Sequence, residues 1–326
     1  MLVPVLLFIL GLVLLIKGGD WFVDGATGIA KRFHVPELLI GATVVSIGTT
    51  LPEVMVSANS ALSGHGEIAY GNAIGSIICN TALIAAITVT VKPGRVDSKA
   101  LKGPVIFFFI AAVFYAVNAY AFGRFSRVTG AILMAMFVVY MVYLLLQMKQ
   151  NPQTVQTEEP EEDGKKKKSA SMGMDIVKLL MGAVLIAVGA DFLVDNGTLI
   201  AQEMGVPESV IALTFVALGT SLPELVTAIT SLLKGHGALS LGNVIGANFF
   251  NLVLVSGTAT VLAPFDIPQN SMIAGRNASL VLEIPVMLFV MLFLNIPAIL
   301  RGKLSRVQGV VLLTVYVAFC VIQFAM

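Results

Sequence analysis

Ten stretches of this chain are apolar enough and long enough to cross a lipid bilayer as helices. The hydrocarbon core is about 30 Å thick, so a spanning helix needs roughly 20 predominantly apolar residues. Of the 326 residues, 57% are hydrophobic and 12% are charged, and the mean hydropathy is +0.92, which is outside the soluble range. The sequence therefore predicts an all-α polytopic membrane protein. Its spans are expected at about 2–30, 37–62, 67–91, 104–121, 126–148, 174–203, 208–233, 238–263, 277–297 and 305–325.

The two halves of the chain repeat one another. Residues 36–80 align without a gap onto residues 207–251 at a constant offset of 171, and 20 of the 45 aligned positions are identical. Each half carries five predicted spans, and an odd number of spans makes the second copy enter the membrane in the opposite sense. The sequence therefore predicts two inverted five-helix repeats, related by a pseudo-two-fold axis in the membrane plane.

One hydrophilic segment separates the two halves. It contains a block of acidic residues followed by four lysines, Lys165 to Lys168, a composition typical of a disordered connector. A regulatory contact or a contact with anionic lipid is the alternative role. We expect a first five-helix repeat over 1–148, a cytoplasmic linker over 149–173 and a second five-helix repeat over 174–326.

The positive charges predict the orientation in the membrane. With the N-terminus placed outside, sixteen of the 20 lysines and arginines fall in or beside the inner loops, against three in the outer loops, Arg124, Arg127 and Arg276. Inner loops of membrane proteins carry such an excess. Both termini are therefore expected to be extracellular, and the plasma (inner) membrane is the expected location. The net charge of +1 gives no reason to expect a nucleic-acid partner.

Each repeat places a carboxylate inside an apolar span. Glu53 ends the segment GATVVSIGTTLPE, and Glu224 ends ALTFVALGTSLPE. A charge at mid-bilayer costs about 2.5–3.5 kcal/mol on insertion scales, so such residues usually mark an ion or substrate path. Pro52 has no amide hydrogen, so we expect the helix to break near Gly48 and expose backbone carbonyls. Carbonyls, hydroxyls and a carboxylate are the oxygen ligands that hard cations such as Na⁺ and Ca²⁺ take.

A second motif, GNxxGxxxxN, follows in each repeat and is predicted to form a wall facing the first. Residues four apart share one face of a helix. In the first copy this face holds Asn72, Ser76 and Asn80. In the second copy it holds Asn243, Ala247 and Asn251, so one hydroxyl is missing there.

These paired motifs resemble the α-repeats of the cation/Ca²⁺ exchanger superfamily, in particular its prokaryotic Na⁺/Ca²⁺ exchanger branch. GTTLPE and GTSLPE are each followed by GNxIG, and the resemblance covers essentially the whole chain, with α-repeats at about 37–91 and 208–263. It implies a secondary active antiporter that exchanges Na⁺ for Ca²⁺ by alternating access, in which the first and sixth spans slide across the other eight. It also implies a transporter rather than an enzyme, with transported ions and no resident cofactor.

The resemblance implies that oxygen ligands from both repeats hold the ions. The Ca²⁺ ligands would be Glu53, Glu224 and the carbonyls of Thr49 and Thr220. An inner Na⁺ site would use the Ser46 carbonyl, Thr50, Ser76 and Glu224. Its outer partner would use the Ala217 carbonyl, Thr220, Ser221 and Glu53, with Asn80 and Asn251 flanking the centre.

Two positions depart from the pattern of this branch. Its members often carry serine where this chain has Ala247, and aspartate where it has Asn251. The first change removes a hydroxyl from the outer Na⁺ site, and the second leaves two carboxylates at the centre. Two carboxylates balance one Ca²⁺, whereas three Na⁺ would leave a net positive charge. Na⁺ coupling and stoichiometry therefore stay open at this point.

Three rival functions follow from the same residues. In an H⁺-coupled or broader divalent-cation antiporter, Glu53 and Glu224 would themselves carry protons, although Ser76 stands where the H⁺-coupled branch usually has glutamate. A cation channel would use the same oxygen ligands without an alternating gate. An intramembrane enzyme would need a nucleophile with a nearby base, or histidine and cysteine metal ligands, and no histidine lies in a predicted span near the Ser and Thr cluster.

Overall fold

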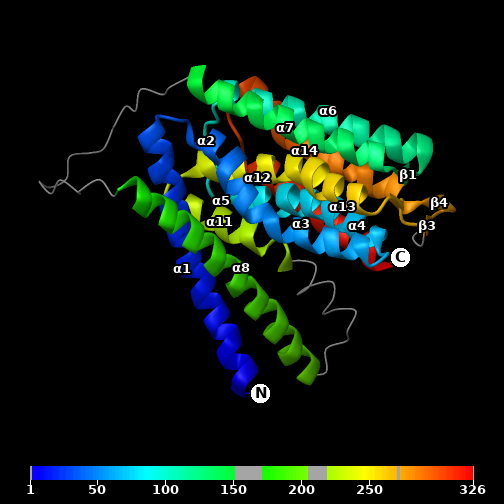
Figure 1. Ribbon diagram of the computed structural model, residues 1–326, viewed down its shortest axis with the longest axis horizontal. Coiled ribbons are helices and arrows are strands. Elements are labelled where there is room, and N and C mark those ends of the chain that lie inside the picture. The colour runs from blue at the N-terminus through cyan, green and yellow to red at the C-terminus, as the bar shows by residue number, and fades with distance from the viewer. Residues whose placement is uncertain (1, 151–170, 205–218, 270–271, 326) are drawn as a thin grey trace, which may run out of the picture.

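The computed structural model describes residues 2–150, 171–204, 219–269 and 272–325 (Figure 1). Within these ranges nine helices are long and apolar enough to cross a membrane, and Leu222–Leu233 is a shorter apolar helix. The prediction of an all-α polytopic membrane protein is confirmed. The predicted span over 208–233 begins among residues outside the described part, so only its second half is visible.

The helices follow the chain in two similar series. The first half forms α1 (Leu2–Phe33), α2 (Glu37–Ile40), the π-helical segment η1 (Gly41–Val45), α3 (Ser46–Leu62), α4 (Gly66–Cys79), the π-helical η2 (Asn80–Ala85), α5 (Ala86–Val91), α6 (Ser98–Phe122) and α7 (Arg127–Gln150). The second half forms α8 (Met172–Glu203), α11 (Leu222–Leu233), α12 (Gly237–Phe250), the π-helical η4 (Asn251–Val255), α13 (Ser256–Leu262), the π-helical η5 (Ser279–Glu283), α14 (Ile284–Arg301) and α15 (Arg306–Ala325).

The element boundaries obey the same offset of 171 residues as the sequence repeat. Helix α12 begins and ends 171 residues after α4, and both π-helical segments η2 and η4 begin at the last asparagine of the GNxxGxxxxN motif. Helices α5 and α13 also end at equivalent residues, Val91 and Leu262. The duplication therefore extends from the sequence to the local backbone, including its irregular turns.

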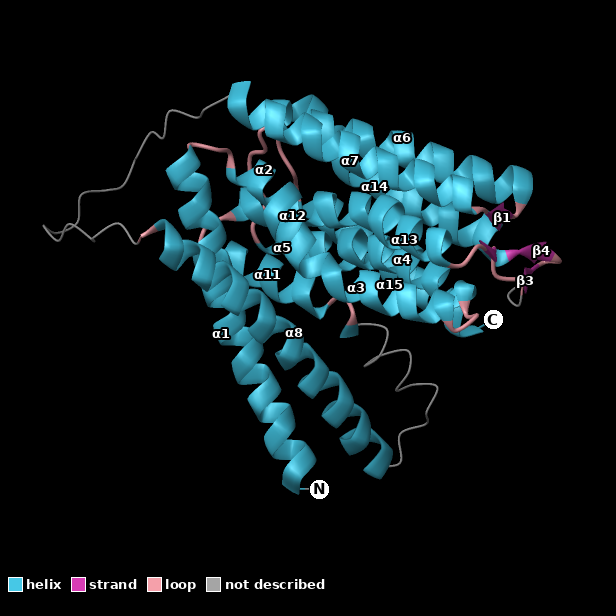
Figure 2. Cartoon of the chain, in the orientation of Figure 1, coloured by secondary structure: helices cyan, strands magenta, loops and turns pink. Residues whose placement is uncertain are grey.

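Helices α1 and α8 form a pair set at an angle to the other helices (Figure 2). Glycines spaced seven residues apart let the two backbones approach closely, as small residues do between membrane helices. A Cβ on Gly182 would lie 2.8 Å from the carbonyl oxygen of Gly18, and one on Gly11 would lie 2.8 Å from that of Gly189. The contacting residue numbers rise on one helix as they fall on the other, so the pair is antiparallel.

The α1–α8 pair packs against both proline motifs of the bundle. A small cavity of about 10 Å³ is bounded by Phe22 and Ile186 of the pair and by Pro52 and Pro223 of the motifs. At one end of the pair, Lys234 after α11 contacts Asp20 and Asp24 of α1, with N–O distances of 3.3 and 2.7 Å. The pair is therefore joined to the bundle by the residues that flank the motifs.

Short strands lie at the end of the bundle that also holds the C-terminus (Figure 1). Strand β1 (Arg124–Phe125) pairs antiparallel with β2 (Phe265–Asp266), which ties the α6–α7 turn to the loop after α13. Strands β3 (Met272–Ile273) and β4 (Arg276–Asn277) form a small hairpin. The strands connect helix ends and contribute no layer of their own.

Candidate ion-binding site

The first proline motif lies on α3, directly after the π-helical segment η1. The break expected near Gly48 is not present, because α3 is continuous from Ser46 to Leu62 with Pro52 inside it. The irregular backbone lies about a turn earlier, in η1, and π-helical turns are frequent at functional sites. A proline removes only one backbone hydrogen bond, so a membrane helix can continue through it when neighbouring groups satisfy the freed carbonyl. The carbonyl freed here is that of Gly48.

The second proline motif shows the local structure that the sequence predicts. Helix α11 begins at Leu222, with Pro223 and Glu224 in its first turn. Proline is favoured at that position because its missing amide hydrogen costs nothing there. Thr220 and Ser221 lie just before the helix, whereas Ala217 lies outside the described residues. The two motifs therefore share a sequence but differ in backbone: one lies within a helix and the other begins one.

Glu53 and Glu224 are completely buried and lie close enough to interact electrostatically. None of their four carboxylate oxygens has a hydrogen-bond partner among the described residues. A buried charge is very costly unless it is paired or bound to a metal ion. Two neighbouring carboxylates without described partners therefore form a site that a bound metal cation or protons would neutralise.

Neutral oxygens surround this pair. The side chains of Thr50, Asn80 and Asn251 are fully buried and have no hydrogen-bond partner among the described residues. Asn80 and Asn251 lie at equivalent positions, at the start of η2 and η4. Hydroxyl and amide oxygens of this kind complete the coordination of a hard cation.

Two of the predicted carbonyl ligands, Ser46 and Thr49, have hydroxyls that are already engaged. The Ser46 hydroxyl shares its one hydrogen between two carbonyl oxygens, that of Gly41 at 2.6 Å and that of Asn243 at 3.0 Å. The Thr49 hydroxyl donates to Oδ1 of Asn243 at 3.2 Å. These bonds fix two residues of the first repeat on α12 of the second repeat, so the two halves share one site.

Two asparagines act as positioning residues, a role that the sequence analysis did not assign. Asn72 donates to the backbone carbonyl of Glu53 at 3.3 Å and to the Ser57 hydroxyl at 2.9 Å. The Oδ1 of Asn243 accepts a hydrogen bond from the Thr49 hydroxyl of the other repeat. Both belong to the stripe of the GNxxGxxxxN motif, which was the available signal, but their partners depend on how the helices pack.

A cavity of about 490 Å³ reaches this region from the end of the bundle. Asn72, Ser76 and Thr220 line it, so the structure brings these residues of the two repeats together. Its wall also includes the partly exposed Glu283 and Gln323, which are joined by a hydrogen bond of 2.9 Å. The cavity therefore joins the partly exposed Glu283 and Gln323 to Ser76 and Thr220, two of the predicted ion ligands.

The site carries two carboxylates rather than a larger cluster. Over the described ranges, no group of three or more His, Cys, Asp and Glu side chains is placed to hold a metal ion. Asn251 occupies the centre as a neutral, fully buried side chain, and Ala247 offers no polar atom. The centre therefore provides a charge of −2 when both glutamates are ionised.

The sequence matches a known family and several relatives along nearly its whole length. The profile of the family described as "Sodium/calcium exchanger protein" matches residues 3–146 and 174–325. The chain is 30% identical to the sodium/calcium exchanger MaX1 of Methanosarcina acetivorans, over 98% of each chain. It is 33% identical to the putative antiporter CaxA of Alkalimonas amylolytica, over 100% of each chain.

The fold also matches solved structures. The sodium-calcium exchanger NCX_Mj, in a structure obtained with 10 mM Na⁺ and zero Ca²⁺, superposes with a TM-score of 0.81 at 31% sequence identity. The match covers 97% of each chain. The similarity therefore extends over both repeats and is not confined to the proline motifs.

Proposed function

This chain is a membrane antiporter of the sodium/calcium exchanger family, and from this premise we propose that it exchanges Na⁺ for Ca²⁺ across the membrane by alternating access. The observation that carries the proposal is the buried pair Glu53 and Glu224, whose oxygens have no partner in the described part of the protein. Two carboxylates neutralise one Ca²⁺, and Ca²⁺ prefers carboxylate and carbonyl oxygens.

In this proposal the two repeats supply the ligands in matching roles. Ca²⁺ binds between Glu53 and Glu224 with the carbonyls of Thr49 and Thr220. Na⁺ occupies an inner and an outer site, which share those carboxylates with hydroxyls, carbonyls and amides. The inner site uses Ser46, Thr50 and Ser76, the outer site uses Ala217, Thr220 and Ser221, and Asn80 and Asn251 flank the centre. The unpartnered side chains of Thr50, Asn80 and Asn251 support this assignment.

The proposal includes two five-helix repeats, 1–148 and 174–326, joined by a cytoplasmic linker over 149–173. Both termini face the cell exterior, and the protein resides in the plasma (inner) membrane. The cavity past Glu283 and Gln323 lies at the end of α15 and the start of α14, and in this orientation it is extracellular. Motion of the α1–α8 pair across the bundle closes that route and opens one to the cytoplasm.

One observation favours a second coupling ion. Asn251 leaves the centre with two negative charges, which three Na⁺ would exceed by one. Exchange of Ca²⁺ for protons needs only that the two glutamates accept protons, so it fits a two-carboxylate centre. H⁺-coupled Ca²⁺ antiport is therefore the alternative.

The deciding experiment is Ca²⁺ uptake into proteoliposomes that contain the purified protein. We expect uptake when the vesicles are loaded with Na⁺, and none when they are loaded with K⁺ at the same pH. Uptake that requires an acid-loaded interior instead would replace Na⁺ by H⁺ as the coupling ion. Uptake driven by a membrane potential alone, with no exchange partner, would identify a channel and overturn the antiport proposal.

A further inference from the structure

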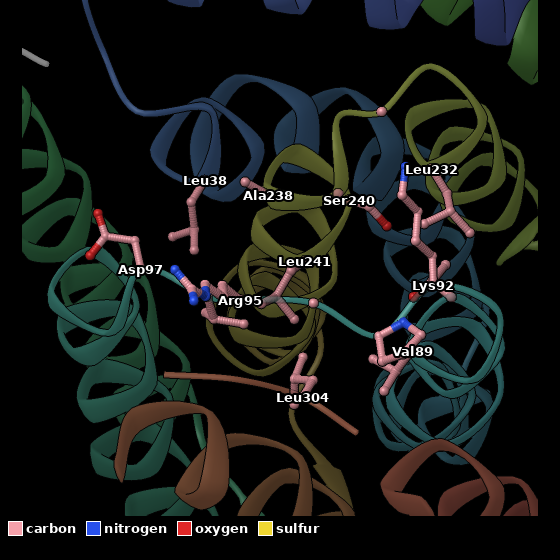
Figure 3. Close-up of a pocket in the computed structure, with 16 residues that line it drawn as sticks. Leu38, Val89, Lys92, Arg95, Asp97, Leu232, Ala238, Ser240, Leu241 and Leu304 are labelled. Atoms are coloured by element: carbon pink, nitrogen blue, oxygen red, sulfur yellow. The ribbon is translucent and has the colours of Figure 1, made fainter. Parts of the chain in front are cut away.

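A third cavity, of about 260 Å³, lies at the other end of the bundle, away from the cavity that Ser76 and Thr220 line. The loop that joins α5 to α6 forms one side of it, and the start of α12 forms another (Figure 3). Leu38, Leu241 and Leu304 supply apolar surface around these polar walls. This cavity plays no part in the ion site.

Two exposed cations of the α5–α6 loop belong to the lining of the cavity. Lys92 and Arg95 both line it, and Figure 3 shows them on either side of Leu241. Neither side chain makes an ion pair or a hydrogen bond with any residue that the structure describes. The loop itself is held in place, because the amide of Val96 donates to the carbonyl of Gly302 at 2.9 Å and the amide of Leu304 donates to that of Gly94 at 2.9 Å.

The start of α12 adds further donors. The helix has 14 residues, and its first amides include those of Gly237 and Ala238, which line the cavity. No side chain caps this end, and free amides at a helix start attract anions. Ser240 also lines the cavity: its side chain is 2% exposed, and its hydroxyl has no partner among the described residues.

The carboxylates nearby are engaged elsewhere. Asp97 at the cavity edge caps α6, where its Oδ1 accepts the amides of Lys99 and Ala100 at 3.0 and 3.2 Å. Glu37 contacts Nδ1 of His236 at 2.8 Å. The cavity therefore presents two cations, a helix start and a buried hydroxyl, and Asp97, the carboxylate in its described lining, is held by the cap of α6.

The equivalent end of the first repeat shows what is different here. Residues 171 positions earlier place a carboxylate, Glu67, at the first turn of α4, where this end has Ala238. At that end, the phenyl ring of Phe265 packs directly on Gly66. The residue equivalent to Phe265, 171 positions earlier, is Gly94, which lines this cavity. The start of α4 therefore carries a carboxylate, Glu67, and is covered by Phe265. The start of α12 has neither feature, and the open cavity beside it is lined by Lys92 and Arg95.

We propose that this cavity binds the phosphate group of an anionic ligand. Lys92 and Arg95 supply the counter-charge, while Ser240 and the first amides of α12 donate hydrogen bonds to the phosphate oxygens. Two sources present such a group at this face, which the proposed orientation makes cytoplasmic: an anionic phospholipid of the adjacent leaflet, and a soluble phosphate compound. Basic pockets between membrane helices bind lipid headgroups in this way.

The test compares variants that remove the same charge from two places. Lys92→Gln with Arg95→Gln changes the cavity, whereas Lys99→Gln with Lys303→Gln removes two exposed cations that do not line it. A third variant, Ala238→Glu, installs the carboxylate of the first repeat at a helix start, where a negative charge favours folding. Binding of inorganic phosphate is measured by calorimetry on the full-length protein in detergent without Ca²⁺. Retention of phosphatidylglycerol is measured by native mass spectrometry after exchange into nanodiscs of mixed phosphatidylcholine and phosphatidylglycerol.

We expect both cavity variants to weaken binding at least about tenfold, as loss of charge-assisted hydrogen bonds does, and the control to stay within about twofold. Binding of inorganic phosphate assigns a soluble source, and selective retention of phosphatidylglycerol alone assigns a lipid source; either supports the site. Equal weakening in the control, or no binding in either measurement, overturns it. Because no ion gradient is used, the result is independent of the exchange activity.

Discussion

At the scale of single residues, the candidate ion site consists of buried oxygens that have no partner among the described residues. Glu53 and Glu224 are the charged members, and Asn80 and Asn251 are neutral members at the start of two π-helical segments. Most buried polar groups in proteins are hydrogen-bonded. A group of exceptions in one place is therefore expected to have ligands, and here hard cations fit.

Replacement of Glu53 or Glu224 by glutamine should abolish Ca²⁺ transport. Loss of one partner of a buried charge interaction costs about 3–5 kcal/mol, so Ca²⁺ flux should fall at least about a hundredfold. Glutamine has nearly the same shape, so expression and the gel-filtration profile should be unchanged. The measurement is Ca²⁺ uptake into proteoliposomes, with Glu67→Gln at an exposed helix start as the control. Robust transport by either buried variant would refute the site.

Asn251→Asp should change the dependence of transport on Na⁺. The new carboxylate would bring the centre to three negative charges, enough to balance three Na⁺, so the Na⁺ concentration for half-maximal exchange should fall several-fold. Na⁺ titration of Ca²⁺ uptake measures this, and Asn118→Asp, on a helix that does not contribute to the proposed site, serves as the comparison. An unchanged Na⁺ titration would show that position 251 does not set the coupling.

At the scale of the helices, the two repeats reach similar sites by different backbones. Helix α3 continues through Pro52 after a π-helical turn, whereas α11 begins next to Pro223. Asn243 connects α12 to Thr49 on α3, and Asn72 holds the backbone of Glu53. The duplicated sequence is therefore compatible with two local structures, and contacts between helices select one at each place.

The α1–α8 contact provides a prediction at this scale. A side chain on Gly182 would meet main-chain atoms of Phe22 and Gly18, with its Cβ 2.7 Å from the Phe22 Cα. Gly182→Leu should therefore separate the two helices, and overpacking costs about 1–3 kcal/mol or more. We expect a lower thermal unfolding temperature in detergent and reduced transport. The control is Gly173→Ala on the same helix, where a Cβ meets only the Ser171 hydroxyl at 3.8 Å; it should leave the unfolding temperature and transport unchanged. A Gly182→Leu variant as stable as the unaltered protein would contradict the tight contact.

At the scale of the whole molecule, the two halves share one bundle and one site. Ser46 and Thr49 of the first half contact Asn243 of the second, and strand β1 pairs with β2 across the halves. The proposed ion site therefore forms only when both repeats are packed together. The linker between them contributes none of the residues that this site uses.

Deletion of residues 155–170 should accordingly leave Ca²⁺ exchange intact. These residues belong to the hydrophilic segment between the repeats and lie outside the described part of the chain. Uptake into proteoliposomes by the shortened protein should match that of the full chain within about twofold, since solvated connectors of this composition rarely form packed structure. Complete loss of transport with a normal gel-filtration profile would show that the segment has a direct role.

Much of the fold and the site was predictable from sequence because the signals are local. Span lengths follow from runs of apolar residues, and the predicted boundaries at 37–62 and 67–91 lie within a residue of the observed helices. Buried Glu53 and Glu224 were also predictable, because a carboxylate in an apolar span is costly and usually faces the interior of the bundle. The continuous helix through Pro52 was not, since a proline removes one hydrogen bond and the neighbours decide whether the helix ends.

The sequence by itself determined that this chain is a duplicated membrane protein with a carboxylate in each copy, because hydropathy and repetition are properties of residue order. Only the tertiary structure decided which oxygens remain without partners, how Asn243 reaches the other repeat, and where Lys92 and Arg95 lie. Those facts depend on distances between residues far apart in the chain. Such distances are set when helices pack against one another. Two repeats of similar sequence can therefore differ in packing: Phe265 covers the start of α4, whereas an open cavity with positively charged lining residues lies at the start of α12.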